Sequence, residues 1–273
     1  MCELLALSTS QPTRLTFSLH TLAARGGNTG NAHDGWGVAF YQGADVALFR
    51  EPLAAGDSAM VRYLETEGPS THLAISHIRH ATQGEVQLAN TQPFVRELGG
   101  RTHVFAHNGD LPYIERNAVF TIGHHRPVGQ TDSEHAFCAL LERLRTIWEQ
   151  PDLPSLEARM AVLAEFAADL RALGPANFFY ADGDALFAHS DRRMQRASGQ
   201  TAPPGLWSLQ RCCTPVDTLP DRNAGVAIEM EARSAVFVAS VPLTEEAWLS
   251  MAEGELLVVR AGEILMRRLA TPE

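Results

Sequence analysis

The first third of the chain is patterned as short apolar runs separated by polar and turn residues. Residues 2–8 (CELLALS) predict a buried strand. Residues 35–41 and 45–51 predict two strands of a hairpin around Gln42-Gly43-Ala44. Residues 72–81 and 103–109 are apolar runs of strand length that end in polar loops. We therefore expect these segments to build sheets whose strand ends carry polar side chains.

Helical patterns are placed between these strands and after them. Residues 15–25 favour a helix followed by a glycine-rich loop, and Asp57 is a candidate cap for a helix that runs to about Glu67. Thr131 to Glu134 spells T-D-S-E, a capping-box pattern, before a long amphipathic helix. We expect further helices at about 155–173 and, shorter, near 244–252.

Strand patterns return in the last third of the chain. Residues 177–190 predict a hairpin with Asp182-Gly183 at its turn. Further strands are expected at 206–211, 226–231, 235–241 and 255–260. Strands early and late, with two long helices between them, argue against regular βαβ alternation. They predict an α+β layered fold with largely antiparallel sheets, which we interpret as a single domain over residues 1–273.

The composition of the chain argues against nucleic-acid binding, membrane insertion and secretion. The 273 residues carry a formal net charge of −10 and no basic cluster, so we expect no binding to nucleic acid. No run of about 18 apolar residues predicts a membrane span, and the first residues lack the pattern of a signal peptide. We therefore expect a cytoplasmic protein whose four cysteines are reduced thiols.

Cys2 is the cysteine with an unusual position. If Met1 is removed, the Cys2 thiol and a free α-amino group belong to one residue. An α-amine has a pKa of about 7.7–8.0, so it can act as the general base for the thiol. On its own, a cysteine here also fits a small apolar residue that opens a strand.

Three further features at strand ends or helix starts carry candidate chemistry. Arg79 can bind a carboxylate through two parallel hydrogen bonds, although arginine at a strand end is commonly an ion-pair residue. The Asn108 amide and the Gly109 N–H can form an oxyanion hole, although Asn-Gly is commonly a turn. Asp132 can pair with a substrate ammonium, although aspartate also suits the first turn of a helix.

The histidines give little support for a metal site. His33-Asp34 matches the HD pair of metal phosphohydrolases in two residues only. His77 and His80, and the pair His124-His125, have no recognisable ligand spacing. We therefore predict no metal.

Taken together, the segments MCELLALS, HIRHATQG, AHNGDL and TDSE resemble the glutaminase domain of class II glutamine amidotransferases, an N-terminal-nucleophile hydrolase family. Their order and rough spacing agree with that family. The stretches RGGNTGNAHDGWGVAFY, NTQPFVRELGGRTHVFAHNGDL and RPVGQTDSEHAFCALL are similar to a compact stand-alone bacterial subgroup, the YafJ-like proteins. The clear matching covers about residues 1–145.

The resemblance implies a four-layer αββα sandwich and a role for each matched residue. Cys2 is implied as the nucleophile with its α-amine as base, and Asn108 and Gly109 as the oxyanion hole. Arg79, supported by Thr82, and Asp132 are implied as the groups that bind the α-carboxylate and α-ammonium of the substrate. The hydrolysis needs no metal or cofactor. One departure is Gln83, where family members often have histidine.

The implied activity is an amidohydrolase that acts on the γ-amide of glutamine or of a γ-glutamyl conjugate through a Cys2 thioester and releases ammonia or an amine. The chain has no room for a fused synthase domain, so ammonia from glutamine would pass to a separate synthase. These motifs recognise the glutamyl half and do not distinguish the two substrates. The alternatives are a catalytically silent regulatory or scaffold protein that keeps the fold, and an HD-type phosphohydrolase.

Overall fold

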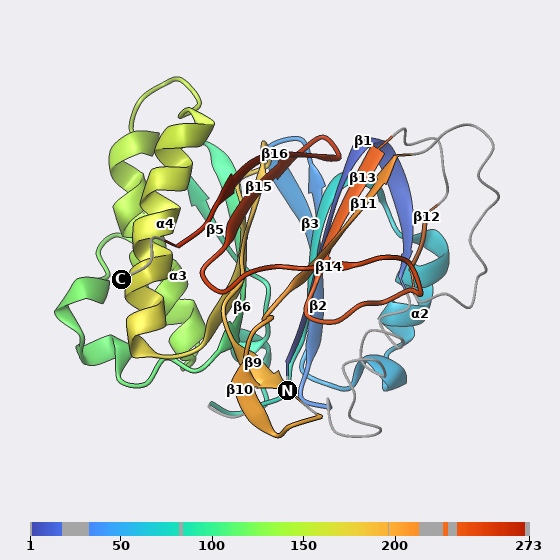
Figure 1. Ribbon diagram of the computed structural model, residues 1–273, viewed down its shortest axis with the longest axis horizontal. Helices are drawn as coiled ribbons and strands as arrows, with labels where there is room; N and C mark the ends of the chain where they lie inside the picture. The colour runs from blue at the N-terminus through green and yellow to red at the C-terminus, as the bar shows by residue number, and fades with distance from the viewer. Residues whose placement is uncertain are drawn as a thin grey trace.

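Two antiparallel sheets lie face to face in the computed structural model, with helices outside them (Figure 1). The structure describes residues 2–17, 33–81, 84–195, 197–212, 226–228 and 234–270, with the backbone alone at 15–17 and 226–228. Helices α3 (Asp132–Trp148) and α4 (Leu156–Leu173) cover one sheet, and α2 (Ala59–Glu67) lies against the other. This is the four-layer αββα arrangement of an α+β fold, as expected from the sequence.

The first sheet has eight strands in the order β14-β11-β13-β1-β4-β2-β3, with β12 paired to β1. Their bounds are β1 (Glu3–Phe17), β2 (Trp36–Gln42), β3 (Asp45–Glu51), β4 (Ser70–Ile78), β11 (Trp207–Cys212), β12 (Val226–Ile228), β13 (Ser234–Ala239) and β14 (Leu249–Ser250). Strand β1 lies in the interior of this sheet, between β13 and β4. The amino-terminal strand is therefore fixed on both edges by backbone hydrogen bonds.

The second sheet has six strands in the order β16-β15-β8-β7-β6-β5. Their bounds are β5 (Phe94–Leu98), β6 (Arg101–Gly109), β7 (Ala176–Ala181), β8 (Leu186–His189), β15 (Leu256–Arg260) and β16 (Glu263–Arg268). A separate short hairpin pairs β9 (Arg193–Gln195) with β10 (Gln200–Ala202). Single turns of 3₁₀-helix occur at Ala55–Asp57, Leu88–Asn90, Ile114–Arg116 and Ala118–Phe120.

Three apolar layers hold the sandwich together, and β1 contributes to two of them. Leu4 and Ala6 are buried in the layer between the sheets, whereas Leu5 and Leu7 are buried on the face that packs against α2. The third layer lies between the six-stranded sheet and helices α3 and α4. Burial on both faces explains why the first strand is continuously apolar and does not alternate. Each such leucine contributes about 1.5–3 kcal/mol on burial.

Most of the elements expected from the sequence are confirmed. Both hairpins are present, at β2–β3 and β7–β8, and the strands expected at 72–81, 103–109, 206–211, 235–241 and 255–260 are β4, β6, β11, β13 and β15 within a few residues. The two long helices begin at Thr131 and Ser155, whose hydroxyls accept the N–H groups of Glu134 and Ala158. No described helix is long and apolar enough to cross a membrane.

Other expectations need correction. The helix expected at 15–25 is wrong at 15–17, where β1 continues because β12 pairs with it; the remainder lies outside the described residues. Ser58, and not Asp57, caps α2. Residues 244–252 form turns and the short strand β14 instead of a helix, and β5, β9, β10 and β16 were not expected. The strand expected at 226–231 is described only at 226–228. Only one half of the T-D-S-E capping box forms: the Thr131 hydroxyl accepts from Glu134 N. The Glu134 carboxylate instead accepts from Gly129 N and pairs with Arg96.

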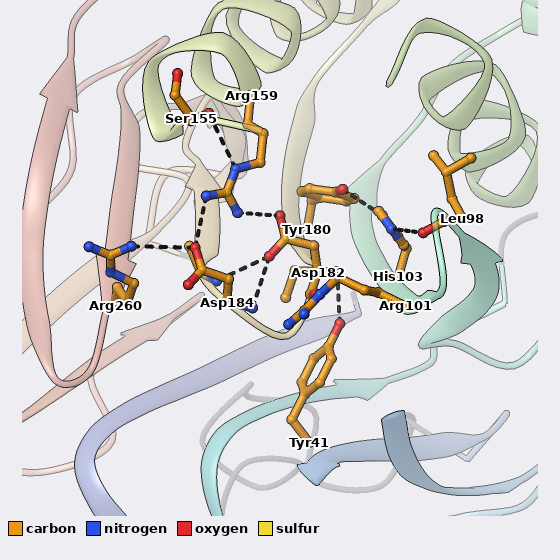
Figure 2. A network of polar contacts seen from close by, with 12 residues as sticks. Tyr41, Leu98, Arg101, His103, Ser155, Arg159, Tyr180, Asp182, Asp184 and Arg260 are labelled. Carbon is orange, nitrogen blue, oxygen red and sulfur yellow. Dashed lines mark hydrogen bonds and ion pairs between the residues drawn. The ribbon is translucent and has the colours of Figure 1, made fainter. Parts of the chain in front are cut away.

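A buried ion-pair network joins α4 to the turn between β7 and β8 (Figure 2). The fully buried Arg159 guanidinium donates to Asp182 at 2.7 Å and to Asp184 at 2.8 Å. On the other side of this turn, the Tyr41 hydroxyl donates to the Ala181 carbonyl at 2.8 Å, which links the first sheet to the second. Removing one partner from such a network leaves a buried charge without compensation.

We predict that Arg159→Met destabilises the protein by about 3–5 kcal/mol, because Asp182 loses its buried countercharge. Arg145→Met is the matched control, since Arg145 pairs with Glu149 at the exposed surface of α3 and its loss is expected to cost below about 1 kcal/mol. Urea denaturation of both variants measures the difference. Equal stabilities of the two variants would contradict a structural role for the buried network.

Candidate active site

Cys2 lies at the point where β1 begins and β4 ends. The register pairs Glu3 with Ile78, which places Cys2 beside the residues that follow β4. The Cys2 thiol accepts a hydrogen bond from the His80 N–H at 3.1 Å and donates to the His80 carbonyl at 3.3 Å. Burial raises the pKa of the Cys2 thiol, and the His80 N–H opposes this in part. The thiol is therefore protonated at neutral pH and requires a base to become a nucleophile.

Asn108 connects the end of β6 in the second sheet to Cys2 in the first. Its side-chain nitrogen donates to the Cys2 carbonyl at 2.8 Å and to the Ser240 hydroxyl at 3.2 Å. Its side-chain oxygen lies 3.2 Å from His77 Nε2. Burial lowers the pKa of His77 to about 3, so this imidazole is neutral and donates from Nε2. Three partners thus fix the orientation of the amide.

Gly109 lines the same two cavities as Cys2. A Cβ atom at this position would lie 1.9 Å from the Pro175 carbonyl oxygen and 2.6 Å from His107 Nε2. Any side chain would therefore displace the backbone of the following strand. The site requires glycine here, and the absence of a side chain leaves space beside Cys2.

Arg79 and Asp132 enter the same region from opposite sides. The buried Arg79 guanidinium donates to the carbonyl oxygens of Gly84 and Glu85, each at 3.2 Å, and to that of Asp34 at 3.4 Å. These three bonds orient the guanidinium group. Asp132, the first residue of α3, accepts from Leu111 N at 2.9 Å and from Ser133 N at 2.7 Å. Both side chains are thus held in place before a ligand arrives.

Two cavities meet at Cys2. A small cavity of about 40 Å³ is lined by Cys2, Arg79, Gly109 and Asp132, together with polar side chains such as Gln92. A second cavity of about 380 Å³ is lined by Cys2, His80, Asn108, Gly109, Asp110, Pro175, Asn177, Arg192, Arg193, Met194 and Thr201. The structure therefore brings together five of the six site residues expected from the sequence. The sixth, Thr82, lies outside the described residues, as does Gln83.

Several supporting residues are absent from the expectations. Besides His77 and Ser240, Gln92 donates to the His107 carbonyl at 3.1 Å and accepts from the His107 N–H, which holds the end of β6. Glu3 is buried and pairs with Arg193 of β9 at 2.9 Å. These partners come from segments distant in sequence. The one local signal is Glu3, a charged residue within the otherwise apolar run at residues 2–8.

His33-Asp34 has a structural explanation. The Asp34 carboxylate accepts from Ala81 N at 2.8 Å and lies 3.6 Å from His80 Nδ1, so it supports the loop after β4. Within the described residues, no group of three His, Cys, Asp or Glu side chains is placed to hold a metal ion.

The chain is similar in sequence to several known proteins. A profile of the class II glutamine amidotransferases matches residues 1–272. YafJ of Escherichia coli K12 is 34% identical over 268 residues, which cover 96% of this chain and 99% of YafJ. The protein MJ1515 of Methanocaldococcus jannaschii is 30% identical over 97% of this chain and 71% of its own length.

Solved structures agree. A Pseudomonas aeruginosa protein described as a predicted glutamine amidotransferase shares 34% identity and superposes with a TM-score of 0.68, covering 97% of this chain and all of that one. The glutamine phosphoribosylpyrophosphate amidotransferase of Bacillus subtilis, at 15% identity, shares the fold with a TM-score of 0.57 over 98% of this chain and 49% of its own. The chain belongs to the class II glutamine amidotransferase family.

Proposed function

We propose that this protein hydrolyses a γ-glutamyl amide, with Cys2 as the nucleophile. The observation that carries the proposal is that one small polar cavity is lined by a thiol, an arginine, an aspartate and a glycine backbone. A glutamyl group carries an α-carboxylate, an α-ammonium and a γ-carbonyl. Arg79 and Asp132 have the charges that complement the first two, and Cys2 and Gly109 are beside the third.

The proposed reaction proceeds in two steps. The Cys2 sulfur attacks the γ-carbonyl carbon, its proton passes to the α-amine, and the C–N bond breaks as that proton moves to the departing ammonia or amine. Water then attacks the thioester, gives one proton to the α-amine, and releases glutamate as the sulfur regains its proton. The raised pKa of the thiol makes an adjacent base necessary in the first step.

This base requires a mature chain that begins at Cys2. With Met1 attached, the Cys2 nitrogen is part of an amide and has no basic lone pair. Removal of Met1 is therefore part of the proposal. The proposal also treats residues 1–273 as one glutaminase-like domain.

The oxyanion is assigned to Asn108 and Gly109. Without substrate, the Asn108 amide already donates to the Cys2 carbonyl and to Ser240. The contact with Ser240 is the longer of the two, and it is the one that an oxyanion would replace. The neutral His77 at the other end of the amide keeps the nitrogen directed toward Cys2.

The nature of the leaving group is open to two candidates. Free glutamine would release ammonia, to be used by a separate synthase. The second cavity favours a γ-glutamyl conjugate with a larger amine, because about 380 Å³ beside the thiol greatly exceeds the space for ammonia, a molecule comparable to water at about 30 Å³. This volume falls within the usual range of small-ligand sites, about 300–1,000 Å³. A catalytically silent scaffold would not need the two cavities that Cys2 lines.

The direct test is to trap the thioester. We predict that Met1-free protein, mixed with glutamine or a γ-glutamyl amide and quenched in acid, shows a γ-glutamyl adduct on the peptide that begins at Cys2. Cys2→Ala should remain folded, form no adduct and lose nearly all hydrolysis. Intact and peptide mass spectrometry with a melting curve measures all three. A folded, active Cys2→Ala protein would exclude the mechanism.

A second prediction separates oxyanion stabilisation from binding. Asn108→Ala should lower kcat by about 10²–10³, the usual cost of one oxyanion donor, with a smaller change in KM. Asp132→Ala should raise KM more prominently, because it removes the partner of the α-ammonium. Steady-state kinetics and melting temperatures of both variants distinguish these effects. If Asn108→Ala changes only the melting temperature, the residue is structural.

The third prediction concerns the larger cavity. Thr201 and Met194 are directly paired across the β9–β10 hairpin and both line that cavity, whereas the neighbouring Gln200 does not. Thr201→Trp should lower kcat/KM for γ-glutamyl anilide at least about tenfold and leave glutamine turnover nearly unchanged, because only the bulky amine needs the filled space. Gln200→Trp is the matched control, since successive strand residues face opposite sides. Equal effects of both variants on both substrates would remove the larger cavity from substrate recognition.

A further inference from the structure

A third cavity, of about 210 Å³, lies away from Cys2 between α4 and the second sheet. Three small residues of α4 border it, Ala164, Ala167 and Ala168, and Arg171 follows one helical turn later on the same face. The opposite wall contains His189 of β8 and Leu256 of β15, which are paired in the sheet. Arg268, at the end of β16, completes the set of cationic side chains.

His189 is the unusual residue of this cavity. It is 1% exposed, and neither ring nitrogen has a partner in regular hydrogen-bond geometry among the described residues. Burial, with a smaller contribution from Arg171, lowers the pKa of His189 to about 3, although a hydrogen bond with the Glu255 backbone, outside that regular geometry, opposes this. Buried polar groups without a partner are rare and commonly indicate an ion, water or ligand. A neutral imidazole here has one N–H to donate.

The two arginines strengthen this indication. Arg267 pairs with Glu255 at 2.7 Å, but Arg171 and Arg268 form no ion pair with any described carboxylate. The Arg171 Nε–H is buried and also lacks a partner in the described part of the chain. Arg268 is exposed at the rim of the cavity, whereas Arg171 is partly buried, so Arg171 is the arginine whose lack of a partner is informative.

We propose that this cavity is a binding site for a small oxyanion, a carboxylate or phosphate, held by Arg171, Arg268 and the N–H of His189. Guanidinium groups bind such anions through paired hydrogen bonds, and an oxyanion would supply the acceptors that the buried donors of Arg171 and His189 lack. The volume admits an anion of several heavy atoms.

The site is separate from the catalytic cavities but close in sequence to one of them. Ser190 and Asp191 follow His189, and Arg192 and Arg193 then line the larger catalytic cavity. The Asp191 carboxylate accepts from Ala176 N at 3.0 Å, and the Asn177 side chain accepts from Asp191 N at 2.7 Å, so this connecting segment is bound to β7. An anion at His189 would therefore bind beside a segment that shapes the catalytic cavity, although the site itself contains no residue proposed for the chemistry.

Two sources of oxyanion must be distinguished. One is a free small molecule, and the other is the carboxylate of Glu273, three residues after Ala270 at the cavity rim. Inorganic phosphate is the probe, titrated by calorimetry against chloride at matched ionic strength. The proteins are wild type, Arg171→Gln, His189→Phe and a variant without residues 271–273, which removes every carboxylate that follows Ala270 in this sequence. Arg62→Gln, an exposed arginine of α2, is the matched control for loss of one positive charge.

We expect phosphate to bind wild type, and Arg171→Gln to weaken this binding at least tenfold, with no change in Arg62→Gln. His189→Phe keeps the aromatic volume beside Phe178 and should also weaken binding. Binding that appears only in the variant without residues 271–273 identifies the chain's own carboxylate as the occupant of the same site. Equal binding by wild type, Arg171→Gln and His189→Phe, or none by wild type and by the variant without residues 271–273, overturns the proposal. Each titration repeated in a Cys2→Ala background does not depend on hydrolysis, so failure of the catalytic proposal would leave this result interpretable.

Discussion

The structure depends on the apolar layer shared by the two sheets. Strand β1 contributes Leu4 and Ala6 to this layer while Leu5 and Leu7 pack on its other side, so the strand is buried on both faces. Backbone hydrogen bonds to β13 and β4 fix its two edges. A strand constrained in this way has no freedom to slide, because a shift by one residue would exchange its two faces. The position of residue 2 is thereby set by the burial of residues 4 to 7.

The same layer decides which strand ends meet. Because the two sheets stack closely, the end of β6 in one sheet reaches the start of β1 in the other, and the Asn108 amide spans the junction to the Cys2 carbonyl at 2.8 Å. The buried pair of Glu3 and Arg193 binds the β9–β10 hairpin to the same strand start at 2.9 Å. A nucleophile on a loop would require separate elements to hold it. Here the sandwich itself positions the thiol, and the hairpin forms the outer wall of the larger cavity.

Local sequence patterns predicted those features that depend on local physics. Apolar runs, turn glycines and the cap at Thr131 predicted the hairpins, the long helices and the α+β class, and the order of the motifs predicted the family. Long-range pairing explains the failures: residues 15–17 are a strand because β12 pairs with them, which a helical period cannot reveal. The partners of Asn108 were equally beyond reach, since His77 and Ser240 lie 31 and 132 positions away. Cavity volumes arise from the packing of several elements and have no signature in a motif.

The division of the proposed catalytic region into two cavities bears on its proposed specificity. The small cavity offers charged groups with fixed directions, which suits recognition of the glutamyl half by hydrogen bonds and ion pairs. The larger one offers mainly shape, through Pro175, Met194 and Thr201, and shape alone discriminates between amines by modest factors. An enzyme built in this way would be strict about the glutamyl group and tolerant about the amine attached to it. The β9–β10 hairpin lies outside both sheets, so its residues other than Arg193, which pairs with the buried Glu3, can change without disturbing the layer that places Cys2. Variation in the leaving group is therefore separable from the chemistry, which is consistent with one fold that serves different amide substrates.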